Sequence, residues 1–424
     1  MPSSPSTETL DVGALRAHYP ALDNRVDGKR LVYLDSACTA LKPRCVAERL
    51  GEFYLNWGGC GGKRSTHLLS QRVEEWFQDA RRETADFLGA ERAEEIVFTS
   101  GTTEAVNLVA RAFPFEGDRR EVVLTDMEHN SVLLPLLELE KRGEASLKFC
   151  PVKGGQLDLE AMERLITRRT ALVAVARSSN VLGGLFPVAR VARMARSRGA
   201  RILVDDAQYL SSHREDVRET DADFVAFSSH KLGGPFGVGV LYGKENLLNR
   251  LGVYKVGGGT VKDVSWNGSG AEAVYLDAPM RFEAGVQDLA GVAAFGDALR
   301  FFRAIPERAL RAHIAGLVRR TAEGVARFEE VGLLGEIEDL ERGSIVSFAP
   351  RHPGFSIADF NLYLNHELDG RFIAVRAGEH CAHLLHHKLG VPGTVRVSFF
   401  AYNTLEEADL FLDALGGYIR EACR

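Results

Sequence analysis

The chain has 424 residues, which is long for a single domain, and its 45% apolar and 26% charged residues are typical of a globular protein. No run of residues approaches the ~20 consecutive apolar side chains that a membrane-spanning helix needs. The formal net charge of −6 does not favour nucleic acid or an anionic membrane as the main partner.

The N-terminal stretch "MPSSPSTETLDVG" is polar and lacks the basic-then-apolar pattern of a secretory signal. We therefore expect it to be a short disordered lead-in to a cytoplasmic protein. Six cysteines are scattered along the chain without zinc-finger spacing, and in a cytoplasm we expect them to be reduced thiols.

Apolar runs of strand length alternate with amphipathic stretches between residues 95 and 245. The runs are "EEIVFT", "EVVLTDM", "ALVAVARS", "RILVDDA" and "FVAFSSH", and helical patterns such as "TTEAVNLVARAF" and "PVARVARMARSRG" lie between them. Continuous apolar strands are typical of a mostly parallel sheet with helices on both faces. Because ligands bind outside the carboxyl ends of such strands, the residues that follow each run are the candidates for a site.

The pattern changes near residue 290. Two long helical stretches, "AGVAAFGDALRFFRAI" and "ERALRAHIAGLVRRTAEGVARFEEV", precede short strands at "GSIVSFAP" and "TVRVSFF", and the final helix opens with a Thr-x-x-Glu capping pattern. This predicts a small α+β domain at the C-terminus. We expect an N-terminal segment at residues 1–30 that packs on the small domain, a large domain at residues 31–291, and the small domain at residues 292–424.

Polar side chains follow the first three of these strands. "SGTTEAVNL" places Thr102 and Thr103 at a helix N-terminus, where free N–H groups and hydroxyls can bind a phosphate. His129 in "EHN" can stack on a planar cofactor or transfer protons, and Asn180 in "SNVLGG" can bind a phenolic oxygen or a carboxylate. Taken singly, each also fits an ordinary helix cap, a loop histidine or a turn asparagine.

The last two strands end in an acid and an amine. Asp205 is costly at the end of an apolar strand unless a cation faces it, and Gln208 lies three residues further on. Lys231 follows His230 at a place where desolvation lowers the pKa of an amine and lets it attack an aldehyde. With the phosphate-type loop and His129, these residues describe a pyridoxal 5′-phosphate site. Lys231 would form the Schiff base, Asp205 would keep the ring nitrogen protonated, and His129 would cover the ring.

Longer motifs in the chain resemble those of the class V aminotransferase-like, fold-type I enzymes, in particular the Suf-type (group II) cysteine desulfurases and selenocysteine lyases. The similarity runs almost end to end through "VYLDSACTALKP", "RSTHLLSQ", "SGTTEAVNLV", "EHNSVLLP", "SNVLGG", "LVDDAQ", "SSHKLGGPFGVGVLYG", "GGGT", "RFEAG", "VRAGEHCAHLL" and "RVSFFAYNTLEE". The resemblance implies the α/β fold of a fold-type I pyridoxal-phosphate-dependent transferase. Its large domain would contain a mostly parallel seven-stranded sheet, and its small α+β C-terminal domain would carry the catalytic cysteine.

The resemblance also implies a role for individual residues at the cofactor. Thr102 and Thr103 would hold the phosphate together with Ser228 and His230, and Gln208 would contact the ring oxygen. No metal is expected at this site.

At the substrate, the resemblance implies that Asn180 and Arg396 hold the carboxylate and that Arg376 lines the same pocket. Cys381 falls at the position of the catalytic cysteine, and its spacing from Arg396 is similar to that of the group II enzymes. Since only a thiolate is a competent nucleophile, His380, His383 and Arg376 are candidates for lowering the pKa of this thiol.

The implied activity is that of a cysteine desulfurase, a sulfurtransferase that converts L-cysteine to L-alanine. Lys231 would move the Cα proton, and Cys381 would take the sulfur as a persulfide and pass it to an acceptor protein. Relatives of this type share their active sites across a homodimer.

Four residues depart from the family pattern. Val286 stands where a threonine usually reaches the phosphate of the partner subunit, so we expect weaker cofactor retention. Asp206 replaces a common glycine and would add a second acid near the ring, and Arg177 replaces a frequent histidine. Cys38 replaces a common alanine, and we interpret it as a small space-filling side chain rather than as a sulfur relay.

Other functions remain open. A selenocysteine lyase, a C–S lyase acting on a larger cysteine derivative, or an epimerase would use the same cofactor. A specialised biosynthetic pathway is one setting for such an activity. A simple lyase or epimerase has no chemical need for Cys381, so this cysteine favours persulfide chemistry. A non-catalytic scaffold predicts loss of Lys231 or Asp205, and both are present. Zinc is a further alternative, because a cysteine and four histidines (Cys381, His380, His383, His386 and His387) lie close together in sequence.

Overall fold

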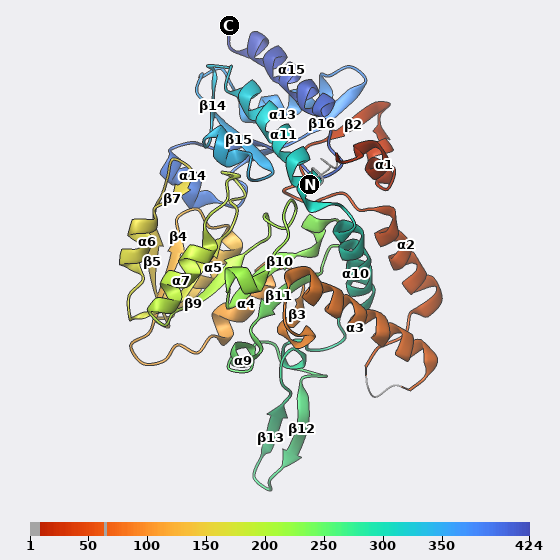
Figure 1. Ribbon diagram of the computed structural model, residues 1–424, viewed down its shortest axis with the longest axis vertical. Coiled ribbons are helices and arrows are strands. Elements are labelled where there is room, and N and C mark those ends of the chain that lie inside the picture. Colours follow the sequence, from red (N-terminus) through yellow and green to blue (C-terminus); the bar gives the residue numbers. More distant parts are fainter. Residues whose placement is uncertain (1–8, 63–65) are drawn as a thin grey trace, which may run out of the picture.

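A seven-stranded sheet forms the centre of the larger part of the molecule (Figure 1). The structure is a computed structural model, and it describes residues 9–62 and 66–424. In spatial order the strands are β3 (Ile96–Thr99), β11 (Gly239–Gly243), β10 (Phe224–Ser228), β9 (Arg201–Asp205), β8 (Thr170–Ala176), β4 (Glu121–Thr125) and β5 (Ser146–Cys150). β11 runs antiparallel to both of its neighbours, and the other pairs are parallel. The predicted mostly parallel seven-stranded sheet is confirmed.

The apolar runs form strands because both faces of the sheet are buried. Along β8, Leu172 and Ala174 pack into one hydrophobic core, and Val173 and Val175 pack into the other. Every residue of β8 is buried. Helices α4 (Thr102–Ala112) and α5 (Asn130–Lys141) contribute to one core, and α7 (Val188–Ser197) and α10 (Leu289–Arg303) contribute to the other. The side chains on both faces of each strand are therefore packed against apolar groups, which is why apolar and polar residues do not alternate along the strands.

The C-terminal part contains a four-stranded antiparallel sheet, at the top of Figure 1. Its strands are β14 (Val331–Leu333), β15 (Ile345–Pro350), β18 (Thr394–Ser398) and β17 (Arg376–Gly378), and its helices are α11 (Glu307–Val325), α13 (Ile357–His366) and α15 (Leu405–Ala422). The capping box predicted for the last helix is present, since Thr404 and Glu407 each accept a hydrogen bond from the other's backbone N–H. The boundaries drawn after residues 30 and 291 stay predictions.

A third sheet joins the two ends of the chain. Strand β2 (Lys29–Tyr33) pairs with β1 (Arg25–Val26) on one side and runs parallel to β16 (Arg371–Ala374) on the other. Helix α1 (Val12–Arg16) precedes this sheet, and Asp11 caps the N-terminus of the helix. The prediction that residues 1–13 form a disordered lead-in is therefore wrong at Val12 and Gly13, which belong to α1. Residues 1–8 lie outside the described part of the chain.

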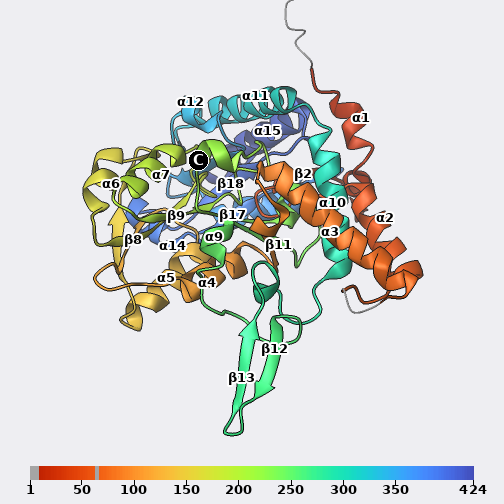
Figure 2. The same ribbon diagram turned by 60° about the horizontal axis from the view of Figure 1, so that its bottom comes forward.

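A hairpin of β12 (Val261–Trp266) and β13 (Ala271–Tyr275) projects from the molecule (Figures 1 and 2). Helices α2 (Arg44–Glu52) and α3 (Leu68–Leu88) pack on α10. The motif "RSTHLLSQ" begins before α3, and its first two residues lie outside the described residues. The remaining α-helices and strands are α6 (Leu159–Leu165), α8 (Val217–Thr220), α9 (Glu245–Leu248), α12 (Ile337–Leu340), α14 (His383–Leu389), β6 (Val152–Lys153) and β7 (Gln156–Leu157). Among residues 9–62 and 66–424, none of the helices has both the length and the apolar composition to cross a bilayer.

Candidate active site

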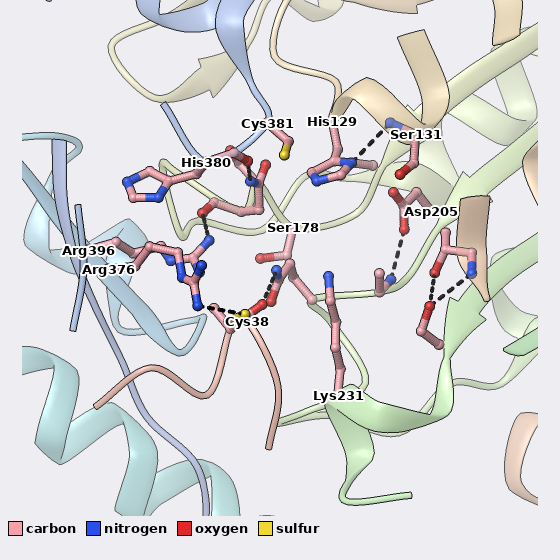
Figure 3. A pocket seen from close by; sticks show the side chains of 18 of the residues that line it. Cys38, His129, Ser131, Ser178, Asp205, Lys231, Arg376, His380, Cys381 and Arg396 are labelled. Carbon is pink, nitrogen blue, oxygen red and sulfur yellow. Dashed lines mark hydrogen bonds between the residues drawn. The ribbon is translucent and has the colours of Figure 1, made fainter. Parts of the chain in front are cut away.

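A cavity of about 420 Å³ lies at the carboxyl ends of the central strands (Figure 3). All twelve residues that the sequence analysis assigned to the site line this cavity. They are Thr102, Thr103, His129, Asn180, Asp205, Gln208, Ser228, His230, Lys231, Arg376, Cys381 and Arg396. The structure thus brings together residues from the large sheet and from the C-terminal part, and their individual roles stay predictions.

One end of the cavity is built from hydroxyl groups and a helix N-terminus. The Thr102 N–H donates to Ser228 Oγ at 2.8 Å, the Thr102 and Ser228 hydroxyls lie 2.8 Å apart, and the Thr103 and Ser131 hydroxyls lie 2.7 Å apart. The loop before α4 lies against β11 so closely that a Cβ on Gly239 would be 2.3 Å from the Cα of Gly101. Only glycine fits there, and the close approach holds the hydroxyls in a cluster suited to an anion.

Lys231 lies on a short 3₁₀ turn (Ser229–Leu232) that follows β10, and Figure 3 shows its side chain extending into the cavity. Burial lowers the pKa of the Lys231 amine, Asp205 opposes this shift, and Arg396 adds to it. A lowered pKa increases the fraction of neutral amine, which is the form that attacks a carbonyl.

Asp205 occupies the last position of β9, deep in the protein. Its carboxylate accepts a hydrogen bond from the Ala207 N–H at 2.9 Å, and its pKa is raised by burial against the opposing effect of Lys231. Behind it, Glu128 is 1% exposed, and burial raises its pKa to about 8. The carboxyl of Glu128 accepts hydrogen bonds from the Thr125 hydroxyl and the Ala176 N–H. A protonated ring nitrogen is the kind of partner that would stabilise Asp205 as a carboxylate.

Asp206 does not face the cavity. The expectation that it adds a second acid near the ring is wrong, because its side chain is fully buried and lies 2.9 Å from Arg177 Nε. Arg177 also pairs with Glu215, and its guanidinium lies over the Tyr209 ring at 4.3 Å. Arg177 and Asp206, which both depart from the family pattern, therefore belong to the same buried ion-pair network, next to Asp205.

The histidines of the cavity are uncharged at neutral pH. Burial lowers the pKa of His129 to about 4 and that of His230 to about 4. His129 Nδ1 accepts the Ser131 N–H at 3.0 Å, so its remaining proton lies on Nε2. A neutral ring can lie flat against an aromatic cofactor without the cost of burying a charge.

The opposite end of the cavity contains two arginines joined by one carboxylate. Arg376 donates to Asp35 from Nη2 at 2.7 Å, and Arg396 Nη2 lies 3.5 Å from Asp35. Arg396 Nη1 also donates to the Asn180 carbonyl at 3.0 Å, and its Nε is buried without a hydrogen-bond partner. Arg376 Nη2 further donates to Cys38 Sγ at 2.9 Å.

Asp35 is a charged residue that the sequence analysis missed, as it missed Ser131 of the hydroxyl cluster. It follows β2 in "LVYLDSACTA", and a carboxylate after an apolar strand is the same signal that identified Asp205. The strand in question belongs to a different sheet, however, and the pairing of β2 with β16 and the bridge from Asp35 to Ser398 on β18 bring Asp35 next to Arg376.

Cys381 lies at the mouth of the cavity on an exposed loop, and Figure 3 shows its sulfur directed toward His129. Its φ is 55° and that of His380 is 50°, so two successive non-glycine residues adopt the left-handed conformation. Asn180 Nδ2 donates to the His380 carbonyl at 2.7 Å, and the Asn130 N–H donates to the Cys381 carbonyl at 2.8 Å. The start of α5 and the loop after β8 therefore fix the Cys381 loop through its backbone, and the thiol stays exposed.

His380 does not act as a cation next to Cys381. Burial, followed by the charge of Arg396, lowers the pKa of His380 to about 3, so its ring is neutral. In the part of the chain that the structure describes, no group of three histidine, cysteine or acidic side chains is arranged to hold a metal. All six cysteines are free thiols, and Val286 is 77% exposed and outside the cavity lining.

Residues 32–411 match the family model "Aminotransferase class-V". The chain belongs to this family. It is also 38% identical over 410 residues to a probable cysteine desulfurase of Halobacterium salinarum, with 96% of each chain covered.

Two solved structures are similar throughout. One is the cysteine desulfurase CsdA (S-sulfonic acid) from Escherichia coli, with a TM-score of 0.87, 32% identity, and coverage of 98% of this chain and 100% of that chain. The other is the apo cysteine desulfurase from Thermococcus onnurineus NA1, with a TM-score of 0.87, 34% identity, and coverage of 98% and 99%. The predicted family and fold are thus confirmed, while the Suf-type subgroup stays a prediction.

Proposed function

We propose that this protein is a pyridoxal 5′-phosphate-dependent cysteine desulfurase that converts L-cysteine to L-alanine and retains the sulfur on Cys381. The observation that carries the proposal is the presence of Lys231 and Cys381 in one cavity, with a buried acid at the back and two arginines at the side. The full-length similarity to cysteine desulfurases supports the same activity.

The residues of the cavity fit the cofactor. The hydroxyl cluster and the α4 N-terminus would hold the phosphate, Asp205 would pair with the ring nitrogen, and Gln208 and His129 would contact the ring. When bound, pyridoxal 5′-phosphate supplies an aldehyde for the substrate amine and an electron-withdrawing ring that stabilises negative charge at Cα.

The chain's own groups position the substrate and move its proton. The buried Arg396 guanidinium has an unpartnered Nε and lines the cavity, so it can bind the substrate carboxylate, and Asn180 contacts it through its main-chain carbonyl. Burial lowers the pKa of the Lys231 amine, which favours the neutral form that can take the proton from Cα and return it.

Cys381 completes the reaction at the sulfur. Its thiolate would attack the substrate sulfur, so that an S–S bond forms while the Cβ–S bond breaks with its electron pair left on the substrate carbon. Protonation of that carbon yields alanine, and the protein keeps a persulfide. The exposed position of the thiol allows an acceptor protein to remove the sulfur next.

The proposal is tested by single-turnover assays with L-cysteine on the cofactor-loaded protein, its Cys381→Ala variant, and a Cys60→Ala control that removes another exposed cysteine. We expect alanine and a Cys381 persulfide, seen by mass spectrometry, in the wild type and the control. The Cys381→Ala variant should form neither but should keep the visible band of the bound cofactor. Full alanine formation by Cys381→Ala would overturn the desulfurase proposal.

A homodimer, a sulfur-acceptor protein and a cytoplasmic location belong to the same proposal. Sedimentation of the purified protein tests the dimer, and transfer of labelled sulfur to a candidate acceptor tests the partner. Selenocysteine assayed in parallel, with selenide release as readout, distinguishes the desulfurase from a selenocysteine lyase.

A further inference from the structure

Three arginines lie in a row across the sheet that joins the two ends of the chain. In the register of this sheet, Arg25 on β1 is directly opposite Arg30 on β2, and Arg30 is directly opposite Arg371 on β16. Residues that face each other across neighbouring strands have their side chains on the same side of the sheet. The three guanidinium groups are therefore adjacent, and we call them the arginine row.

The arginine row is electrostatically unfavourable by itself. Like charges directly opposite each other on neighbouring strands destabilise a sheet. Among residues 9–62 and 66–424, the side chains of Arg30 and Arg371 form no hydrogen bond or ion pair, and that of Arg25 donates only to the Gly28 carbonyl at 3.2 Å. None of the ion pairs in the described chain involves these three arginines, which points to a ligand of opposite charge.

The arginine row lines a cavity of about 390 Å³ that is separate from the candidate active site. The first turn of the 18-residue helix α15, from Thr404 to Glu407, forms the facing wall, and its N-terminus adds positive potential. Glu407 is already paired with Arg16 at 2.8 Å. This leaves Glu406 as the remaining acidic side chain of the lining, against three arginines.

We propose that this cavity binds a small dianionic oxyanion, namely a phosphate or a phosphate monoester. Guanidinium groups bind phosphate oxygens through paired N–H donors, and a dianion would balance the excess of two positive charges in the cavity. The volume suits a small molecule rather than a polymer.

The proposed site does not overlap the substrate pocket, because the two share no lining residue. After Arg30, strand β2 leads to Asp35, and after Arg371, strand β16 leads to Arg376. The arginine row and Arg376 thus lie at opposite ends of the same pair of strands. Binding of the oxyanion should therefore not compete with L-cysteine.

The test is thermal unfolding of the cofactor-loaded protein against inorganic phosphate and, separately, glycerol 3-phosphate, at ionic strength held constant with NaCl. For the wild type we expect a saturable rise in Tm of ~2–5 °C. The double variant Arg30→Gln/Arg371→Gln should lose this rise, and its Tm without phosphate should be no lower than that of the wild type, because the repulsion is relieved. A tighter response to the monoester than to phosphate would identify an organic phosphate as the ligand.

The control is Arg190→Gln/Arg193→Gln, which removes the same charge from the exposed face of α7. It should keep the full response to phosphate. An equal response in the control and the row variant, or none in the wild type, would overturn the proposal. A markedly lower Tm for the row variant would also contradict it, because the arginines would then stabilise the sheet by themselves.

Discussion

The two sides of the candidate active site are built in opposite ways. On the side of the large sheet, Lys231 and Asp205 lie at strand ends in the protein interior, and burial shifts their pKa values away from the charged forms. On the other side, Cys381 is exposed on a loop whose backbone is held in a left-handed conformation. The buried side suits chemistry that water would disturb, and the exposed side suits delivery of sulfur to another molecule.

This contrast teaches that the two halves of the reaction can be separated by mutation. Changes on the buried side should alter cofactor binding, stability and pH dependence together. Changes at the Cys381 loop should alter sulfur transfer and leave the rest of the protein intact. The following predictions challenge this division, beginning with the largest effect.

Replacement of Lys231 by alanine should have the largest effect on activity. It removes the amine that moves the substrate proton, so we expect alanine formation to fall by ~10²–10⁴-fold. The visible band of the lysine-linked cofactor should also disappear, whereas it should persist in Cys381→Ala. Wild-type turnover by the Lys231→Ala protein would contradict the assignment of the proton transfer to the buried side.

Replacement of Arg177 by methionine should have the largest effect on stability. It leaves Asp206 and Glu215 buried without a cation, which typically costs about 3–5 kcal/mol. Denaturant unfolding measures the change in free energy. The matched control is Arg319→Met, which breaks an exposed pair with Glu341 and should cost about 0–1 kcal/mol. Equal losses in the two variants would show that the buried network is not important for stability.

Replacement of Glu128 by glutamine should change how stability depends on pH. The pKa of Glu128 is about 8 in the fold against an ordinary value of 4.5, so the folded state binds the proton more tightly than the unfolded state. The stability from this proton is complete below pH 4.5 and is lost as pH rises to 8, at about 1 kcal/mol per pH unit. Relative to Glu128→Gln, the wild type should therefore lose stability over this range. A pH-independent difference in unfolding free energy would contradict the assignment.

Replacement of Cys38 by alanine should have the smallest effect. Its sulfur accepts one hydrogen bond from Arg376, and that arginine keeps its bonds to Asp35 in the variant. We expect an unchanged rate of alanine formation, in agreement with a space-filling role. A persulfide found on Cys38 after turnover would instead identify it as a second sulfur carrier on the exposed side.

The buried side was the more predictable of the two. The strands that end at Asp205 and Lys231 are continuous apolar runs, and β9 and β10 begin and end within a few residues of these runs. A polar residue that directly follows such a run lies at the carboxyl edge of the sheet, where ligands bind. Thr102, Thr103, His129, Asp205 and Lys231 could therefore be assigned from several strand ends taken together and in chain order, whereas the phosphate roles of Ser228 and His230 came from the family resemblance.

The other side depends on contacts that no local pattern encodes. Asp35 reaches Arg376 through the pairing of β2 with β16 and a bridge to β18, and the Cys381 loop is held by Asn130 at the start of α5 and by Asn180 after β8. Asp206 was misplaced for the same reason, because its partner Arg177 belongs to a neighbouring strand end. The position of Cys381 came from family resemblance and not from hydrophobic periodicity.

The pairing of β2 with β16 has a consequence for how the protein is made. Asp35 and Arg376 are 341 residues apart in sequence, so the carboxylate leaves the ribosome long before its arginine partner. At ordinary synthesis rates of ~5–20 residues per second, this interval is roughly 20–70 s. Strand β2, which carries Arg30, must wait for the same period without β16. A nascent chain therefore cannot hold an amino acid substrate until the segment that carries Arg376 and Arg396 has emerged, and a ribosome that stalls early releases no partly active desulfurase.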